Sequence, residues 1–110
     1  MSKSQRRKGA NFERAIARML RDLGFDAHRG LQGAGARECD VVVDGSRAWL
    51  ELKCGARPNI WAAMRQAVGD APKGRLPIVV AHRDRAETLV CLRLSDVATA
   101  LEADDASEPE

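Results

Sequence analysis

Two carboxylates and a lysine stand at the ends of the otherwise apolar stretch DVVVDGSRAWLELK, which spans residues 40–53. Carboxylates held close together repel each other, and beside an apolar surface one takes up a proton unless a cation joins them. Magnesium relieves this repulsion with one or two carboxylate ligands and leaves its other positions to water and phosphate. Asp40 and Glu51 could share such an ion, while Lys53 orients a water or offsets charge on a phosphate. The three residues suit metal-assisted phosphodiester hydrolysis, although the same pattern also arises by chance on a solvated strand face.

A hairpin is the element that would bring these three residues together. Asp44-Gly45, between two apolar runs, predicts a two-residue turn that pairs Asp40 with Trp49. Because side chains alternate along a strand, one face is then apolar and the other carries all three charged residues. The apolar face consists of Val41, Val43, Ala48, Leu50 and Leu52. Asp40 lies diagonally from Glu51, at a backbone separation of roughly 7–8 Å that carboxylates can close around an ion. A three-residue loop would instead place Asp40 on the opposite face.

The composition is that of a soluble globular protein with a basic body. The 110 residues suffice for one domain, and no apolar run is long enough to cross a bilayer. Residues 1–94 hold 18 basic against 10 acidic residues, a balance typical of proteins with phosphate-bearing partners. A solvated face with an acidic tail that aids solubility would have the same balance, and charge alone does not decide between the two. The three cysteines show no CxxC spacing, so we expect reduced thiols in a cytoplasmic compartment rather than disulfides or zinc.

The hydrophobic periodicity predicts an α/β fold, with one mixed central sheet of about five strands flanked by helices in the order αβββαββα. The predicted elements are a helix over 10–23, strands over 25–29, 38–43 and 46–53, a helix over 57–71, strands over 76–82 and 87–94, and a helix over 96–101. Gly24 is expected as the glycine that ends the first helix, and Ser95 as the N-cap of the last. We expect a single domain over 1–101 with a basic arm over 1–8, and a disordered acidic tail over 102–110.

The charged residues of the hairpin resemble the D…ExK signature of the PD-(D/E)xK nuclease superfamily, carried here by Asp40, Glu51 and Lys53. The predicted order of elements is also that of the superfamily's restriction-endonuclease-like core. More narrowly, RRKGANFERAIARMLRDLGFDAHR resembles the opening of archaeal and phage Holliday-junction resolvases, which have a basic segment, a glycine and a helix bearing an aromatic–Glu pair, here Phe12-Glu13. The resemblance covers residues 6–94. Cys39 departs from the pattern, since a proline usually precedes the first aspartate.

This resemblance implies a role for each matching residue. Asp40 and Glu51 would bind Mg²⁺ together with the backbone carbonyl of Leu52, with Mn²⁺ able to substitute, and Lys53 would orient or activate the water. Glu13 would complete the acidic cluster from the first helix, although acids also favour a helix's first turn through its dipole. Arg6, Arg7 and Lys8 form either a disordered basic arm or a DNA clamp, and phosphate contact is favoured because the active site implies a phosphate backbone nearby. The remaining assignments carried over are a polar active-site position at Gln66 and DNA contacts at Arg29 and Arg37. The last two flank the loop 30–37, which corresponds to a mobile, DNA-approaching loop. Trp49 and Trp61 are read as core or interface residues.

The expected activity is that of a structure-selective endonuclease on four-way or other branched DNA, leaving a 5′ phosphate. A junction needs two symmetric nicks and a domain this small has one site, so we expect a homodimer. Such an enzyme would serve DNA recombination and repair in the cytoplasm of a prokaryotic or phage-infected cell. Two alternatives stay open: another repair or phage endonuclease that cuts ordinary duplex DNA, and a non-catalytic DNA-binding module of the same fold.

Overall fold

A computed structural model describes residues 2–33 and 36–106 of the chain, without the side chains of residues 32–37 and 103–106. Its elements are α1 (Lys3–Asp22), β1 (Ala27–Arg29), β2 (Gln32–Gly33), β3 (Ala36–Arg37), β4 (Val41–Val43), β5 (Ala48–Gly55), α2 (Ile60–Asp70), β6 (Leu76–Arg83), β7 (Thr88–Cys91), the 3₁₀ turn η1 (Leu94–Asp96) and α3 (Val97–Ala106). None of the helices in these ranges is both long and apolar enough to pass through a bilayer.

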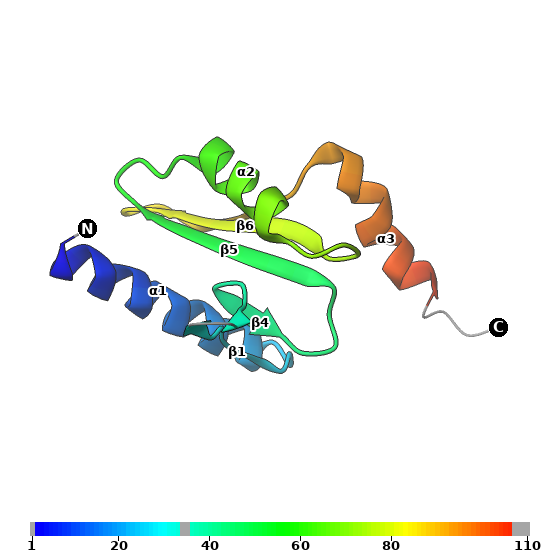
Figure 1. Cartoon of the computed structure of the whole chain (residues 1–110), viewed down its shortest axis with the longest axis horizontal. Coiled ribbons are helices and arrows are strands. Elements are labelled where there is room, and N and C mark those ends of the chain that lie inside the picture. Colours follow the sequence, from blue (N-terminus) through cyan, green and yellow to red (C-terminus); the bar gives the residue numbers. More distant parts are fainter. Residues whose placement is uncertain (1, 34–35, 107–110) are drawn as a thin grey trace.

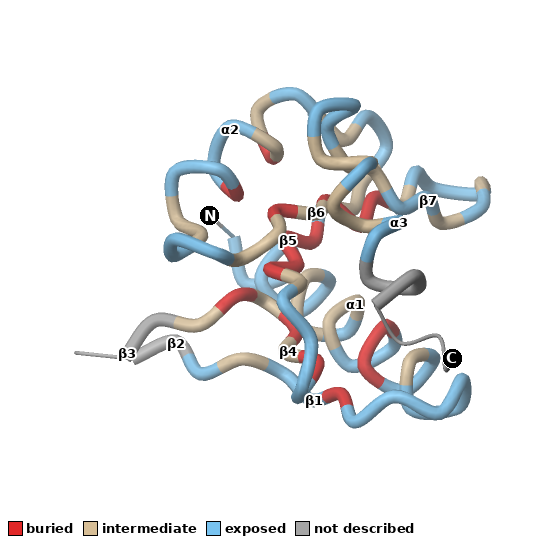
Figure 2. The backbone as a smooth tube through the Cα atoms, turned by 90° about the vertical axis from the view of Figure 1, so that its right-hand side faces the viewer, coloured by how far each residue is buried: buried red, intermediate tan, exposed pale blue. Residues whose placement is uncertain are grey.

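One five-stranded sheet, in the order β1-β4-β5-β6-β7, forms the centre of the molecule. Strands β5 and β6 run parallel, whereas the other neighbours run antiparallel. A parallel pair needs a long crossover, and α2 supplies it by packing on β5 and β6. Helix α1 covers the other face (Figure 1), and the end-on view places the sheet between the two helices (Figure 2). The predicted mixed α/β fold with a restriction-endonuclease-like core is confirmed.

The core lies on both faces of this sheet. On the α1 side, a cluster joins helix and strand residues: Ile16, Ala17, Ala27, Val41, Val43, Leu50, Leu52 and Val80. On the α2 side, Trp49 packs with Ala67, as expected for a core residue beneath the second helix. Its indole N–H is buried without a hydrogen-bond partner among the described residues. The predicted apolar face of the hairpin is therefore confirmed.

Helix α1 begins at Lys3, much earlier than the residue 10 that its hydrophobic pattern predicts, so the predicted start of this helix is wrong. Ser2 and Gln5 form a capping box, in which the Ser2 hydroxyl accepts from the Gln5 N–H and the Gln5 side chain accepts from the Ser2 N–H. The basic residues after Ser2 are therefore part of the helix. At the other end, the predicted glycine is confirmed: Gly24 has φ +101° and donates to the Arg21 carbonyl, while the Phe25 N–H reaches the Leu20 carbonyl.

The predicted hairpin register is wrong by two residues. A two-residue turn pairs Val41 with Ala48, but Val41 instead faces Leu50. The tight turn itself forms, because the Ser46 N–H donates to the Val43 carbonyl. Gly45 has φ +81°, whereas Asp44 is not among the residues with positive φ, so the turn lacks the primed geometry that matches strand twist. Beyond this turn, β4 and β5 are not paired until Val41 meets Leu50. Since a shift of two preserves the faces, the side-chain alternation is retained.

Three further predictions are corrected. The loop 30–37 contains two short paired strands, β2 and β3, with residues 34–35 outside the described part of the chain. Ser95 does not cap the last helix, since it lies inside η1, whose N-cap Arg93 bonds to Asp96. Helix α3 continues to Ala106, so the tail expected to be disordered from residue 102 is helical over 102–106. The last four residues lie outside the described range.

Candidate active site

Asp40 is held at the start of β4 by three backbone contacts. Its N–H donates to the carbonyl of Leu50, which also faces Val41, so two successive residues oppose one in the pattern of a β-bulge. Its own carbonyl accepts from the Gly30 N–H. Its carboxylate Oδ2 accepts from the Leu52 N–H at 2.8 Å. Bulges re-aim side chains, and this one directs the Asp40 carboxylate onto the middle of β5.

Gly30 explains how the chain can pass so close to Asp40. A Cβ atom added to Gly30 would overlap the backbone carbonyl of Cys39, which is not a flexible group. The Cys39 side chain is buried as well, and burial raises the pKa of its thiol. A glycine at this position is therefore required to pack β1 against the residue that precedes Asp40.

Glu51 is the one charged side chain of the described residues that falls in the buried class, with 8% of its surface exposed. It follows Leu50, the partner of Val41, and so lies across the β4–β5 pair from Asp40. The Leu52 N–H points toward Asp40, and in a strand the carbonyl of a residue points to the same side as its N–H. The Asp40 carboxylate and the Leu52 carbonyl therefore lie on the β4 side of β5, next to the position of Glu51 in the strand.

This set of oxygen donors fits a magnesium ion. Magnesium prefers hard oxygen ligands, uses one or two carboxylates and keeps several waters. A buried carboxylate beside a second one also gains from a divalent cation. Among the described residues, no three His, Cys, Asp or Glu side chains form a group that could hold a metal.

Glu13 lies in an ion pair on the α1 side of the sheet. Its Oε1 accepts from both Nε and Nη2 of Arg29, at 3.0 and 2.9 Å. Arg29 pairs with Val41 across β1 and β4, so it belongs to the face that α1 covers. The predicted role of Glu13 in an acidic cluster stays a prediction, and the structure gives Glu13 an arginine partner.

Lys53 lies at the edge of a cleft of about 910 Å³ between the N-terminal half of α1 and the end of β5. It is exposed, and two residues of separation place it on the same face of β5 as Glu51. The cleft is lined by Gln5, Arg6, Lys8, Gly9, Ala10, Phe12, Glu13, Arg29, Leu52, Lys53, Cys54, Gly55, Ala56 and Asp84. Asp40 and Glu51 do not line it, but Leu52 and Lys53, the two residues that follow Glu51, do.

The residues predicted to contact DNA divide between this cleft and other places. Arg6, Lys8 and Arg29 line it, whereas Arg7 is exposed on α1 outside it. The side chain of Arg37 lies outside the described part of the structure. Arg6, Lys8, Arg29 and Lys53 give the cleft a positive charge that suits a phosphate backbone.

Asp84 is a cleft residue that sequence reasoning missed. Its Oδ1 accepts from Lys8 Nζ at 3.0 Å, and its N–H donates to the Gly55 carbonyl at 2.9 Å. Lys8 and Asp84 are 76 positions apart in the chain, so no local pattern links them. Cys54 also lines the cleft, and burial is the main cause of the raised pKa of its thiol.

Two other residues singled out from the sequence lie away from the carboxylate pair and the cleft. Gln66 is exposed on α2 and does not line the cleft. Trp61, on the same helix, is 81% exposed and is therefore not a core residue. Its expected alternative role as an interface residue stays a prediction.

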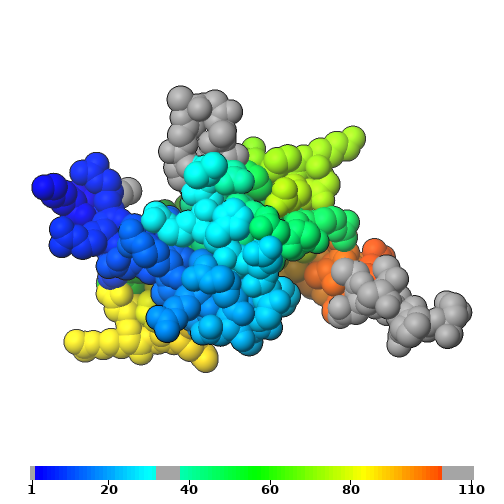
Figure 3. Space-filling model, turned by 90° about the horizontal axis from the view of Figure 1, so that it is seen from below, coloured from blue at the N-terminus to red at the C-terminus, as the bar shows by residue number. Residues whose placement is uncertain are grey.

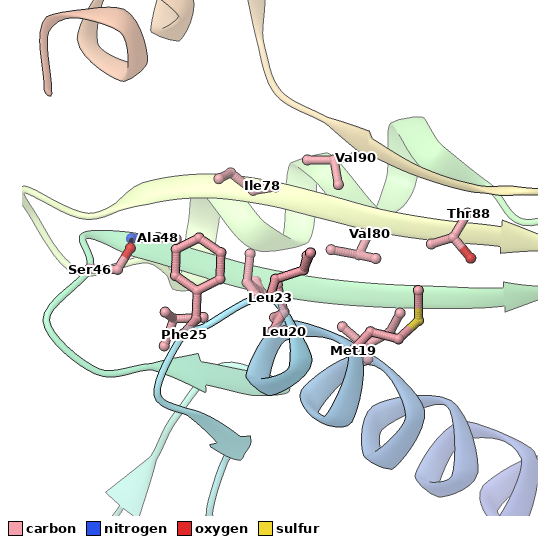
Figure 4. A pocket seen from close by; sticks show the side chains of 13 residues that line it. Met19, Leu20, Leu23, Phe25, Ser46, Ala48, Ile78, Val80, Thr88 and Val90 are labelled. Atoms are coloured by element: carbon pink, nitrogen blue, oxygen red, sulfur yellow. Dashed lines mark hydrogen bonds between the residues drawn. The ribbon is translucent and has the colours of Figure 1, made fainter. Parts of the chain in front are cut away.

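A second hollow, of about 350 Å³, lies between the C-terminal half of α1 and strands β5 to β7, and differs from the cleft in chemistry. Met19, Leu20, Leu23 and Phe25 face Ile78, Val80 and Val90 across it (Figure 4). Its lining contains no charged residue. Because a phosphate needs cationic or polar partners, the basic cleft is the candidate site and the apolar hollow is not.

Comparison with known proteins decides the family. Residues 4–60 match the family of archaeal Holliday junction resolvases (Hjc). This segment is just over half of the chain and contains Glu13, Asp40, Glu51 and Lys53.

The chain belongs to this family.

Membership in the Holliday junction resolvase family implies that the protein is a nuclease and that it binds branched DNA. The resemblance inferred from the D…ExK pattern and the N-terminal segment is thereby confirmed. No curated protein and no solved structure matches the chain.

Proposed function

We propose that this resolvase family member is a magnesium-dependent endonuclease that hydrolyses phosphodiesters at four-way DNA junctions, leaves a 5′ phosphate and acts as a symmetric homodimer. The observation that carries the proposal is the bond from the Leu52 N–H to the Asp40 carboxylate. It fixes the Asp40 carboxylate beside Leu52, which lies between Glu51 and Lys53 in the sequence of β5.

The residues have separate tasks in this proposal. Asp40, Glu51 and the Leu52 carbonyl would hold the Mg²⁺ ion, with Mn²⁺ as a substitute. When bound, the ion supplies Lewis-acid stabilisation of the phosphate and a more acidic water. Lys53 is exposed at the cleft, where its ammonium can orient the attacking water or offset charge that develops on the phosphate.

The cleft would read the shape and charge of DNA rather than its base sequence. Its cations, Arg6, Lys8, Arg29 and Lys53, are suited to phosphate oxygens, which carry no base information. Binding is therefore expected to weaken as salt rises, because phosphate contacts release counterions. The preference for junctions would come from the path of the DNA strands across a dimer, which brings two clefts to one branch point.

Cleavage assays on three substrates test this function. A labelled four-way junction, a flap and a linear duplex of the same length are incubated with the protein in Mg²⁺, in Mn²⁺ and in EDTA. We expect paired nicks with 5′ phosphate ends in the junction, in either metal, and no cleavage in EDTA. Equal cleavage of all three substrates would favour the duplex endonuclease, and junction binding without cleavage in any metal would favour the DNA-binding module.

A further inference from the structure

The cleft beside Lys53 holds its cations in two different states. Arg29 and Lys8 each bond to a cleft acid, Glu13 and Asp84 respectively. Lys53 and Arg6, in contrast, show no hydrogen bond or ion pair of their side chains within the described residues. Two of the four cations of the cleft are thus neutralised in the free protein.

The acid that holds Lys8 is itself fixed in place. Asp84 follows β6, and its N–H bond to the Gly55 carbonyl ties it to the end of β5. The space-filling view shows the β6–β7 segment, in yellow, projecting beside the blue N-terminal half of α1 (Figure 3). The carboxylate therefore stands at the far wall of the cleft, and Lys8 reaches toward it from α1.

The Lys8–Asp84 pair is open to exchange. The side chains are 51% and 44% exposed, so water and a DNA phosphate can both reach them. Exposed ion pairs are weak and are screened by salt. The hydrogen bond and charge of Asp84 raise the pKa of the Lys8 ammonium, so Lys8 stays charged and can exchange one anion for another.

We propose that Asp84 is a positioning residue that competes with DNA phosphate for Lys8 and thereby limits the affinity of the cleft for DNA. The inference rests on the proposed function, because it requires DNA in this cleft. When Lys8 turns to a phosphate, it gives up its bond to the Asp84 carboxylate. Binding therefore breaks an ion pair of the free protein, and the cost of breaking it lowers the affinity for DNA. Since phosphate contacts carry no sequence information, Asp84 lowers affinity for every DNA that reaches Lys8.

Fluorescence anisotropy with a labelled junction in EDTA measures this competition without cleavage. Asp84→Asn keeps the size of the side chain and removes its charge, so it should bind the junction roughly two- to fivefold tighter at low salt. Lys8→Gln should bind more weakly. The double variant Lys8→Gln/Asp84→Asn should bind like Lys8→Gln alone, because Asp84 acts through Lys8. A purely structural role of Asp84 would not produce this dependence on Lys8.

Glu87→Gln is the matched control, since it removes one negative charge from the same β6–β7 segment outside the cleft. It should leave the affinity unchanged. The inference is overturned if Asp84→Asn binds no tighter than wild type, if Glu87→Gln tightens binding equally, or if Asp84→Asn still tightens binding when Lys8 is absent. Failure of the wild type to bind any junction would instead overturn the proposed function, and would be seen before the variants are compared.

Discussion

Asp40 serves the backbone and the proposed site with the same carboxylate. One oxygen, Oδ2, accepts the Leu52 N–H and so takes the place of a ladder bond just before the start of β4. Any metal bound at this point would share a carboxylate that the sheet already orients, so little side-chain freedom remains to be lost on binding. Removal of the side chain would therefore disturb both the strand pairing and the chemistry, and a substitution must separate the two effects.

Asp40→Asn makes this separation, because an amide oxygen can still accept the Leu52 N–H while the negative charge is lost. We expect junction cleavage to fall by about 100-fold or more. Junction binding should be preserved or tighter, since a negative charge near the phosphates is removed. Cleavage rates and anisotropy on the same junction measure both. Asp22→Asn, an exposed acid on α1, should change neither. Wild-type cleavage by Asp40→Asn would show that this carboxylate takes no part in the reaction.

His28 gives the β1–β4 pair a dependence on pH. Its Nδ1 lies 3.0 Å from the Arg29 carbonyl and its Nε2 lies 3.4 Å from Asp44 Oδ2. The backbone bond, and to a lesser degree Asp44, raise the pKa of His28 above its usual 6.5. The folded state therefore stabilises the protonated form of the His28 ring. Its contribution is fully present below pH 6.5 and disappears as the pH rises through the raised folded pKa.

The variant His28→Gln tests the direction of this pH dependence of stability. Urea midpoints measured at about pH 5.5 and about pH 8 should show that the wild type loses more stability with rising pH than the variant does. The difference is expected to be small because both partners are exposed. Asp44→Asn, which removes the second cause, should reduce the pH dependence in part. A wild type that gains stability relative to His28→Gln as the pH rises would contradict the assignment.

At the scale of the elements, substitution by alanine should have opposite effects at Gly69, inside α2, and at Gly24, just after α1. A Cβ atom added to Gly69 or to Gly24 would meet no atom within 4 Å, so packing does not decide the outcome. Gly69 lies inside α2 with ordinary φ, and Gly69→Ala should stabilise the protein by about 0.5–1 kcal/mol. Gly24 has φ +101°, and Gly24→Ala should destabilise it by about 1–2 kcal/mol. Urea unfolding at constant m-value measures both; a gain at Gly24 would contradict the left-handed cap.

Sequence patterns predicted the elements well and their junctions less well. The apolar periodicity located both long helices and all five strands of the main sheet, because burial repeats along each element. The start of α1 was missed because a capping box satisfies the helix end without any apolar residue. The hairpin register was missed because the turn type depends on the φ angle of Asp44, and the residue types Asp44-Gly45 alone do not determine that angle.

The candidate site shows the same limit at longer range. Asp40, Glu51 and Lys53 are 13 residues apart at most and follow from one local pattern, whereas Asp84 reaches Lys8 only through the packing of β6 beside β5. Glu13 is an intermediate case. Its place on α1 was predictable, but its bond to Arg29 depends on how α1 crosses β1. Contacts that depend on tertiary packing therefore cannot be predicted from the spacing of residues along the sequence.

For the whole molecule, one cleft per chain and two cuts per junction predict a dimer. Light scattering with size exclusion should give twice the 12.0 kDa mass of the chain. A dimer should also cut both strands of a plasmid-borne cruciform within one binding event and so release linear DNA. A monomer that shows junction cleavage at the same concentration would contradict this prediction.

A mixed dimer tests whether each protomer cuts one strand. Wild-type and Lys53→Ala chains carrying different affinity tags are co-expressed, and dimers holding both tags are purified. Because Lys53→Ala removes the water-orienting ammonium from one cleft only, the mixed dimer should convert the cruciform plasmid to a nicked circle. The wild-type dimer should give linear DNA and the Lys53→Ala dimer no product. The control is a mixed dimer of wild-type and Lys73→Ala chains, in which the lysine removed is exposed and lies outside the cleft. This control dimer should still release linear DNA. Linear DNA from the Lys53→Ala mixed dimer would show that one site cuts both strands, and the two-site proposal would fail.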